Sequence, residues 1–128
     1  MNTIAKLSLV AALLCGTARA DIIDDAEKGR LVICDTQAQM ERFVTVLESL
    51  DKFEEAIKKV NTEVKDPHAC AETAGAFYRG NVVARANGPG VIFDVVRILA
   101  VAVQQRRGLA PVLPTVFFSA FIVDETGA

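Results

Sequence analysis

The first twenty residues limit what this chain can fold into, because they have the three parts of a removable export signal. Lys6 supplies a charged start, residues 7–14 form an apolar stretch, and Ala18-Arg19-Ala20 is a small-residue cleavage site. The sequence therefore predicts a signal peptide over residues 1–20, cleaved after Ala20. We expect the mature chain to work outside the cytoplasm, in the periplasm or as a secreted protein.

Two other interpretations of the N-terminus compete with a cleaved signal. In a lipoprotein, Cys15 would carry the lipid, but Leu14 stands where such a signal normally has a small residue. A retained membrane helix would need about 20 apolar residues, which is longer than the run found here. The longest apolar stretch after residue 20, residues 91–103, is also too short to span and contains Asp94 and Arg97. We therefore expect no membrane span in the mature chain.

Removal of residues 1–20 leaves 108 of the 128 residues, which is the size of one domain. A domain of that length buries about 65% of its unfolded surface and needs no metal to build a core. The signal contains Lys6 and Arg19, so 12 of the 14 basic residues remain against 16 acidic ones, and the net charge falls from −2 to −4. This balance argues against nucleic-acid binding, which depends on clustered cations. The neighbours Arg106 and Arg107 are expected to solubilise a turn.

Cys34 and Cys70 are the two cysteines of the predicted mature chain. In an oxidising compartment such a pair most simply forms one disulfide, which would stabilise the fold by about 4 kcal/mol in the chain-entropy model. A redox pair normally has the closer Cys-x-x-Cys spacing. A metal site needs more ligands than these cysteines and His68 provide. A structural disulfide is therefore the favoured prediction, and no metal or cofactor is expected.

A strand and two helices are predicted for the first half of the mature chain. Residues 31–34 form a short apolar run, and Thr36 with Gln39 has the form of a capping box that starts a helix. Asp51 resembles the cap of a second helix, whereas charge pairs four residues apart favour a continuous one. We prefer two helices, about 36–49 and 52–61, because the apolar stripe rotates at their junction. The apolar residues of the first stripe are Met40, Phe43, Val44, Leu47 and Leu50.

From residue 74 onward the composition favours strands separated by turns. The predicted strands are 74–78, 82–86, 91–103 and 115–123, with clear turn residues at 87–90. Pro111 and Pro114 confine the segment between them to an edge or a connection. The last strand is uncharged and apolar, which is typical of a core strand or of an edge that pairs with a partner. The whole pattern predicts a single α+β domain, residues 21–128, with two helices packed on a mostly antiparallel sheet of about four to five strands.

Several short motifs together resemble a pattern found in small exported bacterial proteins of unknown function. They are Cys34-Asp35-Thr36-Gln37-Ala38-Gln39, Val60-Asn61, Cys70, Phe77-Tyr78-Arg79-Gly80, Val96-Arg97-Ile98-Leu99 and Phe117-Phe118. The similarity covers most of the mature chain and rests on spacing, not on a catalytic motif. It implies export and a single domain, and it assigns no catalytic role to any residue.

No catalytic motif stands out, so the sequence predicts no catalytic, cofactor-binding or metal-binding residue. Asp94 and Arg97 are charged residues in an apolar strand, for which cross-strand partners or solvent exposure are the ordinary explanations. Two functional hypotheses remain. The first is a non-enzymatic module that binds a protein, an envelope component or a small ligand; the second is a thiol-dependent enzyme using Cys34 or Cys70 with His68.

Overall fold

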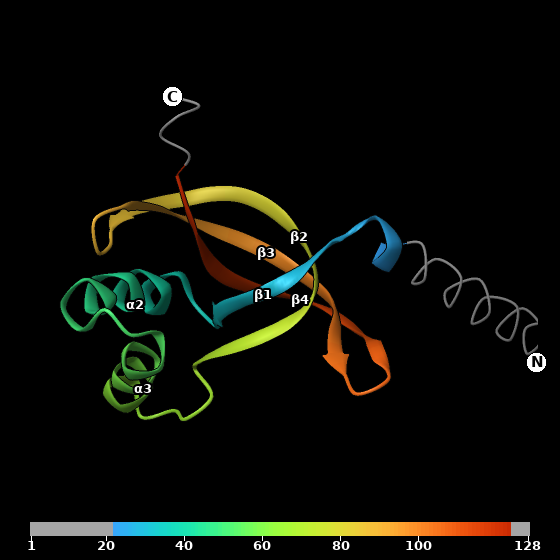
Figure 1. Cartoon of the computed structure of the whole chain (residues 1–128), viewed down its shortest axis with the longest axis horizontal. Helices are drawn as coiled ribbons and strands as arrows, with labels where there is room; N and C mark the ends of the chain where they lie inside the picture. The colour runs from blue at the N-terminus through green and yellow to red at the C-terminus, as the bar shows by residue number, and fades with distance from the viewer. Residues whose placement is uncertain (1–21, 124–128) are drawn as a thin grey trace, which may run out of the picture.

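The computed structural model describes residues 22–123, and its elements follow the predicted order (Figure 1). The strand β1 (Glu27–Cys34) leads into the helices α2 (Gln37–Leu50) and α3 (Phe53–Val64). Three longer strands follow, β2 (Cys70–Asn87), β3 (Ile92–Gln105) and β4 (Gly108–Ile122). The predicted signal peptide, residues 1–20, lies outside the described residues.

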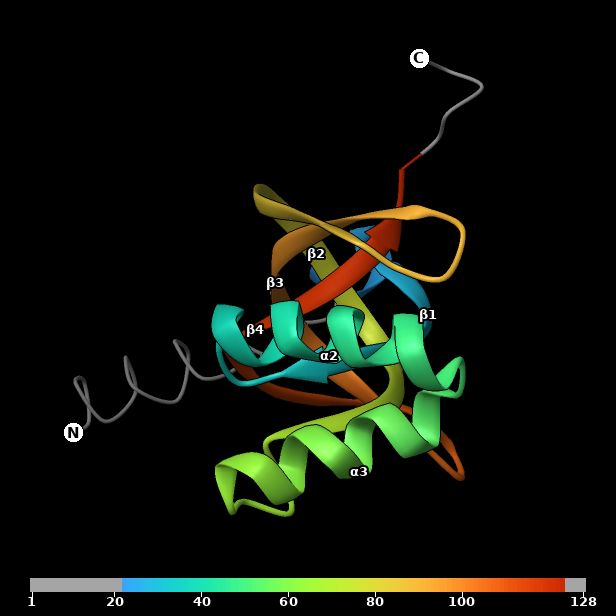
Figure 2. The ribbon, with the colours of Figure 1, turned by 90° about the vertical axis from the view of Figure 1, so that its left-hand side faces the viewer.

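All four strands pair in antiparallel fashion, and the sheet closes on itself in the order β1-β2-β3-β4. Closure is limited, because β1 and β4 pair at one position in the described chain, where Cys34 lies opposite Phe118. The two helices lie together against one side of the strands (Figure 2). The predicted α+β domain, a strand and then two helices packed on an antiparallel sheet, is confirmed.

The long strand β2 differs from the prediction of two strands, 74–78 and 82–86. It runs unbroken for 18 residues, pairing first with β1 and then with β3. The expected break at residues 79–81 is instead a shift of register against β3. Gly80 permits it, because a Cβ there would lie only 2.8 Å from the Arg97 carbonyl oxygen. Such an irregularity bends a strand without ending it, which lets β2 serve two partners.

The strand β3 lies between β2 and β4, as expected of a strand that is apolar on both faces. Burial along β3 does not follow one continuous alternation. Phe93 and Val95 face the helices, whereas Val96 and Ile98 are buried on the opposite face, and Leu99 is 37% exposed. The buried side therefore changes along the strand, from the helix-facing cluster at Phe93 and Val95 to the cluster at Val96 and Ile98, and the register against β4 shifts between Ala100 and Ala102.

The helix boundaries follow from their caps. Thr36 and Gln39 form the predicted capping box at the start of α2. Asp51 ends α2 in the left-handed conformation at φ 57°. The prediction that Asp51 is the N-cap of the second helix is therefore wrong, because Lys52 holds that position. The left-handed residue turns the chain, and two separate helices result. α3 extends to Val64, three residues beyond the prediction.

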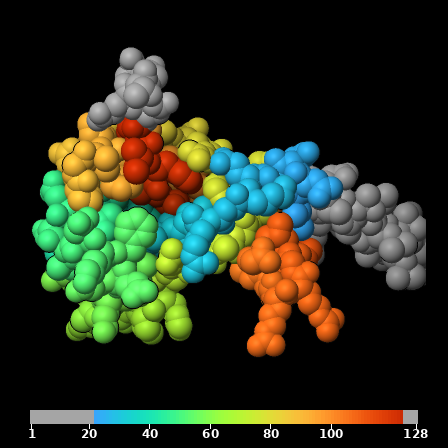
Figure 3. Space-filling view, viewed as in Figure 1, coloured from blue at the N-terminus to red at the C-terminus, as the bar shows by residue number. Residues whose placement is uncertain are grey.

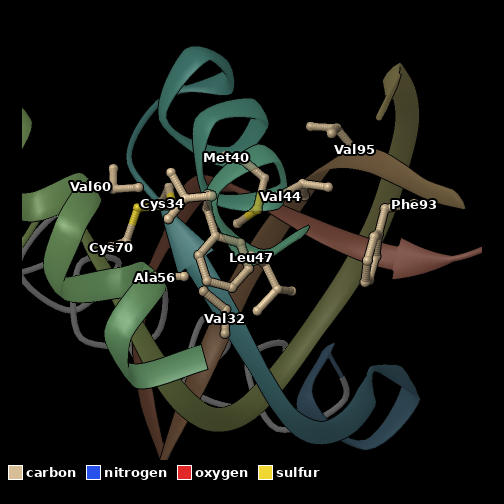
Figure 4. Packing of buried hydrophobic residues seen from close by; sticks show 12 residues of the cluster. Val32, Cys34, Met40, Val44, Leu47, Ala56, Val60, Cys70, Phe93 and Val95 are labelled. Atoms are coloured by element: carbon tan, nitrogen blue, oxygen red, sulfur yellow. A yellow bond between two sulfur atoms is a disulfide. The ribbon is translucent and has the colours of Figure 1, made fainter. Parts of the chain in front are cut away.

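The largest buried cluster lies between the helices and the sheet (Figure 4). The helix α2 contributes Met40, Phe43, Val44 and Leu47 from the predicted stripe, and also Val46, which the stripe did not include. α3 contributes Ala56 and Val60, and the strands contribute residues such as Val32 and Val95. Leu50 lies at the end of α2 and is 37% exposed, because the chain turns away there.

The predicted disulfide joins Cys34 at the end of β1 to Cys70 at the start of β2. These residues lie directly opposite each other in the sheet, and both are buried in the cluster beneath the helices (Figure 4). The bridge therefore closes the loop that contains both helices. It fixes the point where the helical segment leaves and re-enters the sheet.

An ion pair holds the two helices to each other at the surface. Arg42 of α2 donates two hydrogen bonds to Glu63 of α3, at 2.9 and 2.8 Å. These hydrogen bonds lower the pKa of the Glu63 carboxyl below its ordinary value and raise the pKa of the Arg42 guanidinium. The pair is exposed to solvent and fixes geometry more than it stabilises the fold.

Candidate apolar ligand cavity

The face of the sheet opposite the helices carries a partly open apolar cavity of about 410 Å³. All four strands contribute walls, and the large side chains among them are Leu31, Ile33, Phe77, Ile98 and Phe117. Among the described residues that line the cavity, only Thr73 and Thr115 have polar side chains. Cavities of about 300–1,000 Å³ with mainly apolar walls are typical of small-molecule sites.

Small residues on the two central strands create this space. Ala74, Gly75 and Ala76 of β2 and Ala100 and Ala102 of β3 line the cavity where larger side chains would fill it. Gly75 also permits close contact between the strands, because a Cβ at that position would overlap the Ala102 carbonyl oxygen. The hollow is therefore a consequence of which side chains the sequence places at paired positions of β2 and β3.

Phe77, one of the lining residues, is held by aromatic and charged side chains outside the cavity. Phe77 stacks on Phe121 with ring centroids 6.1 Å apart, and the Arg79 guanidinium carbon lies 3.6 Å from the Phe121 centroid. Arg79 also pairs with Glu27 of β1 at 2.8 Å, which ties β2 to β1. A cation held against an aromatic face stabilises this end of the sheet.

Both β1 and β4 line the cavity, and the gap between these two strands is only partly closed. Near the helices this gap is closed by the bridge at Cys34 and by Ser119, whose buried hydroxyl donates a 2.6 Å hydrogen bond to the Val32 carbonyl. Beyond that point β1 and β4 separate, and the hairpin of β3 and β4 projects from the body of the molecule (Figure 3). The separation leaves the space between the strands accessible.

The two strand edges beside this gap are poorly suited to pairing with another strand. β4 contains Pro111 and Pro114, which have no N–H to donate to a ladder, as predicted for an edge segment. β1 presents Lys28 and Arg30 along its exposed half, and charged residues on an edge oppose the addition of a further strand. Addition of a peptide strand at this gap is therefore disfavoured.

The residues that the sequence singled out do not lie in this cavity. Both cysteines of the thiol hypothesis, Cys34 and Cys70, are joined to each other and buried. His68 is exposed in the loop before β2, where its backbone N–H donates a 2.8 Å hydrogen bond to the Asp66 carboxylate. Within residues 22–123, no three His, Cys, Asp or Glu side chains are grouped in a way that would hold a metal ion.

Asp94 and Arg97 have the ordinary explanations that the sequence offered for them. Asp94 accepts a 2.8 Å hydrogen bond from Arg85, its cross-strand neighbour on β2, and Arg97 is exposed. Charge in this apolar strand is thus paired or solvated and does not mark a site.

Tyr78 holds the N-terminal helical turn, residues 22–25, against the sheet. Its hydroxyl donates to the Ile22 carbonyl, and Ile23 and Ala26 pack on the sheet nearby. Burial raises the pKa of the Tyr78 phenol, and the Asp25 carboxylate adds to this effect. The phenol therefore stays protonated at neutral pH and keeps its hydrogen bond.

Sequence patterns did not reveal the cavity. The sequence feature that indicates the cavity is the run of small residues around Gly75 on β2, together with Ala100 and Ala102 on β3. Recognising that signal requires the register that pairs Ala76 with Ala102, and a single strand does not specify its register.

The fold and the site together define an α+β domain with an apolar cavity formed by all four strands of a closed antiparallel sheet. No family model, curated protein or solved structure matches the chain. None of the helices in residues 22–123 has the length and apolar character needed to cross a bilayer.

Proposed function

We propose that the protein is an exported, non-enzymatic binding module whose ligand is a small apolar molecule held in the cavity. The observation that carries this proposal is the cavity itself, about 410 Å³ of space bounded almost entirely by apolar side chains. Burying hydrocarbon from water against such walls is favourable by about 25 cal/mol per Å². The described walls carry no ionisable side chain that could act as a base for the hydroxyls of Thr73 and Thr115, which supports binding without a reaction.

Export is supported by the N-terminal sequence and by the disulfide. Residues 1–20 have the composition of a cleaved signal, and the bridge between Cys34 and Cys70 suits a compartment that favours oxidised thiols. Both features support a periplasmic or secreted location. The similarity to small exported bacterial proteins agrees with this location and stays a prediction.

The alternative of a thiol-dependent enzyme has less support. Such an enzyme needs an accessible thiolate, whereas Cys34 and Cys70 are buried in a disulfide and His68 is exposed on the loop. Alkylation of the purified oxidised protein, followed by mass spectrometry, separates the two functions. The binding module predicts no modified cysteine without reductant; a cysteine that alkylates freely would favour the enzyme.

Displacement of a fluorescent probe tests the cavity directly. N-phenyl-1-naphthylamine is uncharged and becomes brighter in an apolar site, and we expect the oxidised protein to bind it and 1-decanol to displace it. Ala100→Leu adds a larger side chain within the cavity and should abolish binding. Val112→Phe fills the same space from β4 and serves as a second variant.

Ala38→Leu is the matched control, because Ala38 lies exposed on α2 and Leu is nearly as good a helix former as Ala. This variant should bind the probe as the unmodified protein does. Circular dichroism establishes that each variant is folded. Probe binding that survives in both folded cavity variants, or no binding by the unmodified protein, would contradict the proposed function.

A further inference from the structure

The hairpin between β3 and β4 has two arginines at its tip that lack an acidic partner. Arg106 and Arg107 are exposed, and neither pairs with a carboxylate in the described part of the chain. Four other arginines do form such pairs; they are Arg30, Arg42, Arg79 and Arg85. Two adjacent cations on a chain with a net charge of −2 are therefore available to an anion from outside.

The same hairpin forms part of the cavity wall. Ala102 and Val103 of β3 and Val112 of β4 line the cavity, and the pairing of β3 with β4 continues from there to Gln105 opposite Gly108. Arg106 follows Val103 by three residues, which is about 10 Å along an extended strand. The two arginines therefore lie beyond the last lining residue of β3, on the hairpin that also forms part of the cavity wall.

The walls and edges limit the kind of chain that fits. Within residues 22–123, Thr73 and Thr115 alone bring polar side chains to the lining, so the space suits hydrocarbon better than a peptide. Pro111 and Pro114 leave β4 with no N–H at two positions of its edge, which also disfavours an added strand. A single alkyl chain has no backbone polar groups that would need partners.

We infer that the cavity binds an anionic amphiphile with one alkyl chain, the chain lying in the cavity and the carboxylate facing Arg106 and Arg107. This inference rests on the proposed function, because it assigns the head group of the same ligand. Charge complementarity at the hairpin tip then selects a fatty-acid anion over a neutral alcohol of equal length. A carboxylate also suits the two donors that each guanidinium directs at one anion.

Displacement of N-phenyl-1-naphthylamine by sodium decanoate and by 1-decanol tests this selection at neutral pH. The two ligands have ten carbons each and differ in the head group alone. We expect decanoate to bind the unmodified protein more tightly than decanol. For Arg106→Gln/Arg107→Gln we expect decanoate to bind about fivefold more weakly, which is about 1 kcal/mol, with decanol unchanged.

Arg97→Gln is the matched control for loss of a positive charge. Arg97 is exposed on the same strand as Ala102, but its neighbour Ile98 lines the cavity, so its side chain points to the opposite face. Decanoate should bind this variant as it binds the unmodified protein. The advantage of decanoate over decanol should also shrink as salt is added, because the hairpin cations are exposed.

The outcomes separate the two proposals. If neither ligand displaces the probe, the cavity is not a ligand site and the proposed function is wrong. If decanol displaces it and decanoate does so no better, or if the double variant binds both as before, the cavity binds apolar ligands but the arginines do not select an anion. The substituted residues are exposed at a turn, so loss of folding is not expected, and circular dichroism checks it.

Discussion

The disulfide between Cys34 and Cys70 should supply a large part of the stability of this domain. The two residues are 36 apart in sequence, and in the chain-entropy model a closed loop of that length lowers the unfolded-state entropy by about 13 cal/mol/K, or about 4 kcal/mol at 25 °C. Small domains are stable by only about 5–15 kcal/mol in total. Loss of the bridge should therefore lower the free energy of unfolding by about 4 kcal/mol.

Urea denaturation followed by far-UV circular dichroism measures this loss, comparing the oxidised protein with the protein in reductant. The oxidised protein should also show the smaller m-value, because a cross-linked unfolded chain exposes less surface. Cys34→Ala/Cys70→Ala should be less stable than the reduced protein, since it also lacks two buried sulfur atoms. As a control, reductant should not change the double variant. A difference below about 1 kcal/mol between oxidised and reduced protein would refute the reasoning.

Two further substitutions test the close contacts of the sheet. Gly75→Ala should lower the free energy of unfolding by about 1–3 kcal/mol, because its Cβ would overlap the Ala102 carbonyl; Gly29→Ala, which meets no atom within 4 Å, should change it by less than about 0.5 kcal/mol. Equal effects in urea denaturation would show that β2 and β3 do not approach closely at Gly75. Ser119→Ala should cost about 1–3 kcal/mol by leaving the buried Val32 carbonyl without its donor, and a neutral effect would mean that this hydrogen bond does not hold β1 to β4.

The architecture was predictable from local signals that do not depend on the rest of the molecule. The capping box at Thr36, the apolar stripe of α2 and the turn at residues 87–90 each specify their own structure. The disulfide followed from the small number of cysteines. Because these signals come in the order strand, helices and strands, they were sufficient for the α+β class.

Features that depend on strand pairing were not predictable. The sequence predicts two strands, 74–78 and 82–86, where one bent strand passes through Gly80, because glycine signals a break or a bulge equally well until the partner strand is known. Asp51 was interpreted as an N-cap, since aspartate suits that position as well as the left-handed residue that ends α2. The cavity depends on which small residues of β2 and β3 lie side by side, and pairing alone decides this.

The position of a bound ligand is the most direct test of the central claim, that the sheet encloses an apolar binding site. Methyl NMR spectra of the oxidised protein, recorded during titration with 1-decanol, report that position. The account predicts saturable shifts at cavity methyl groups, including those of Leu31, Ile98 and Val103, with little change at Val44 and Val60 beneath the helices. Shifts confined to the helix-facing core, or none at all, would contradict it.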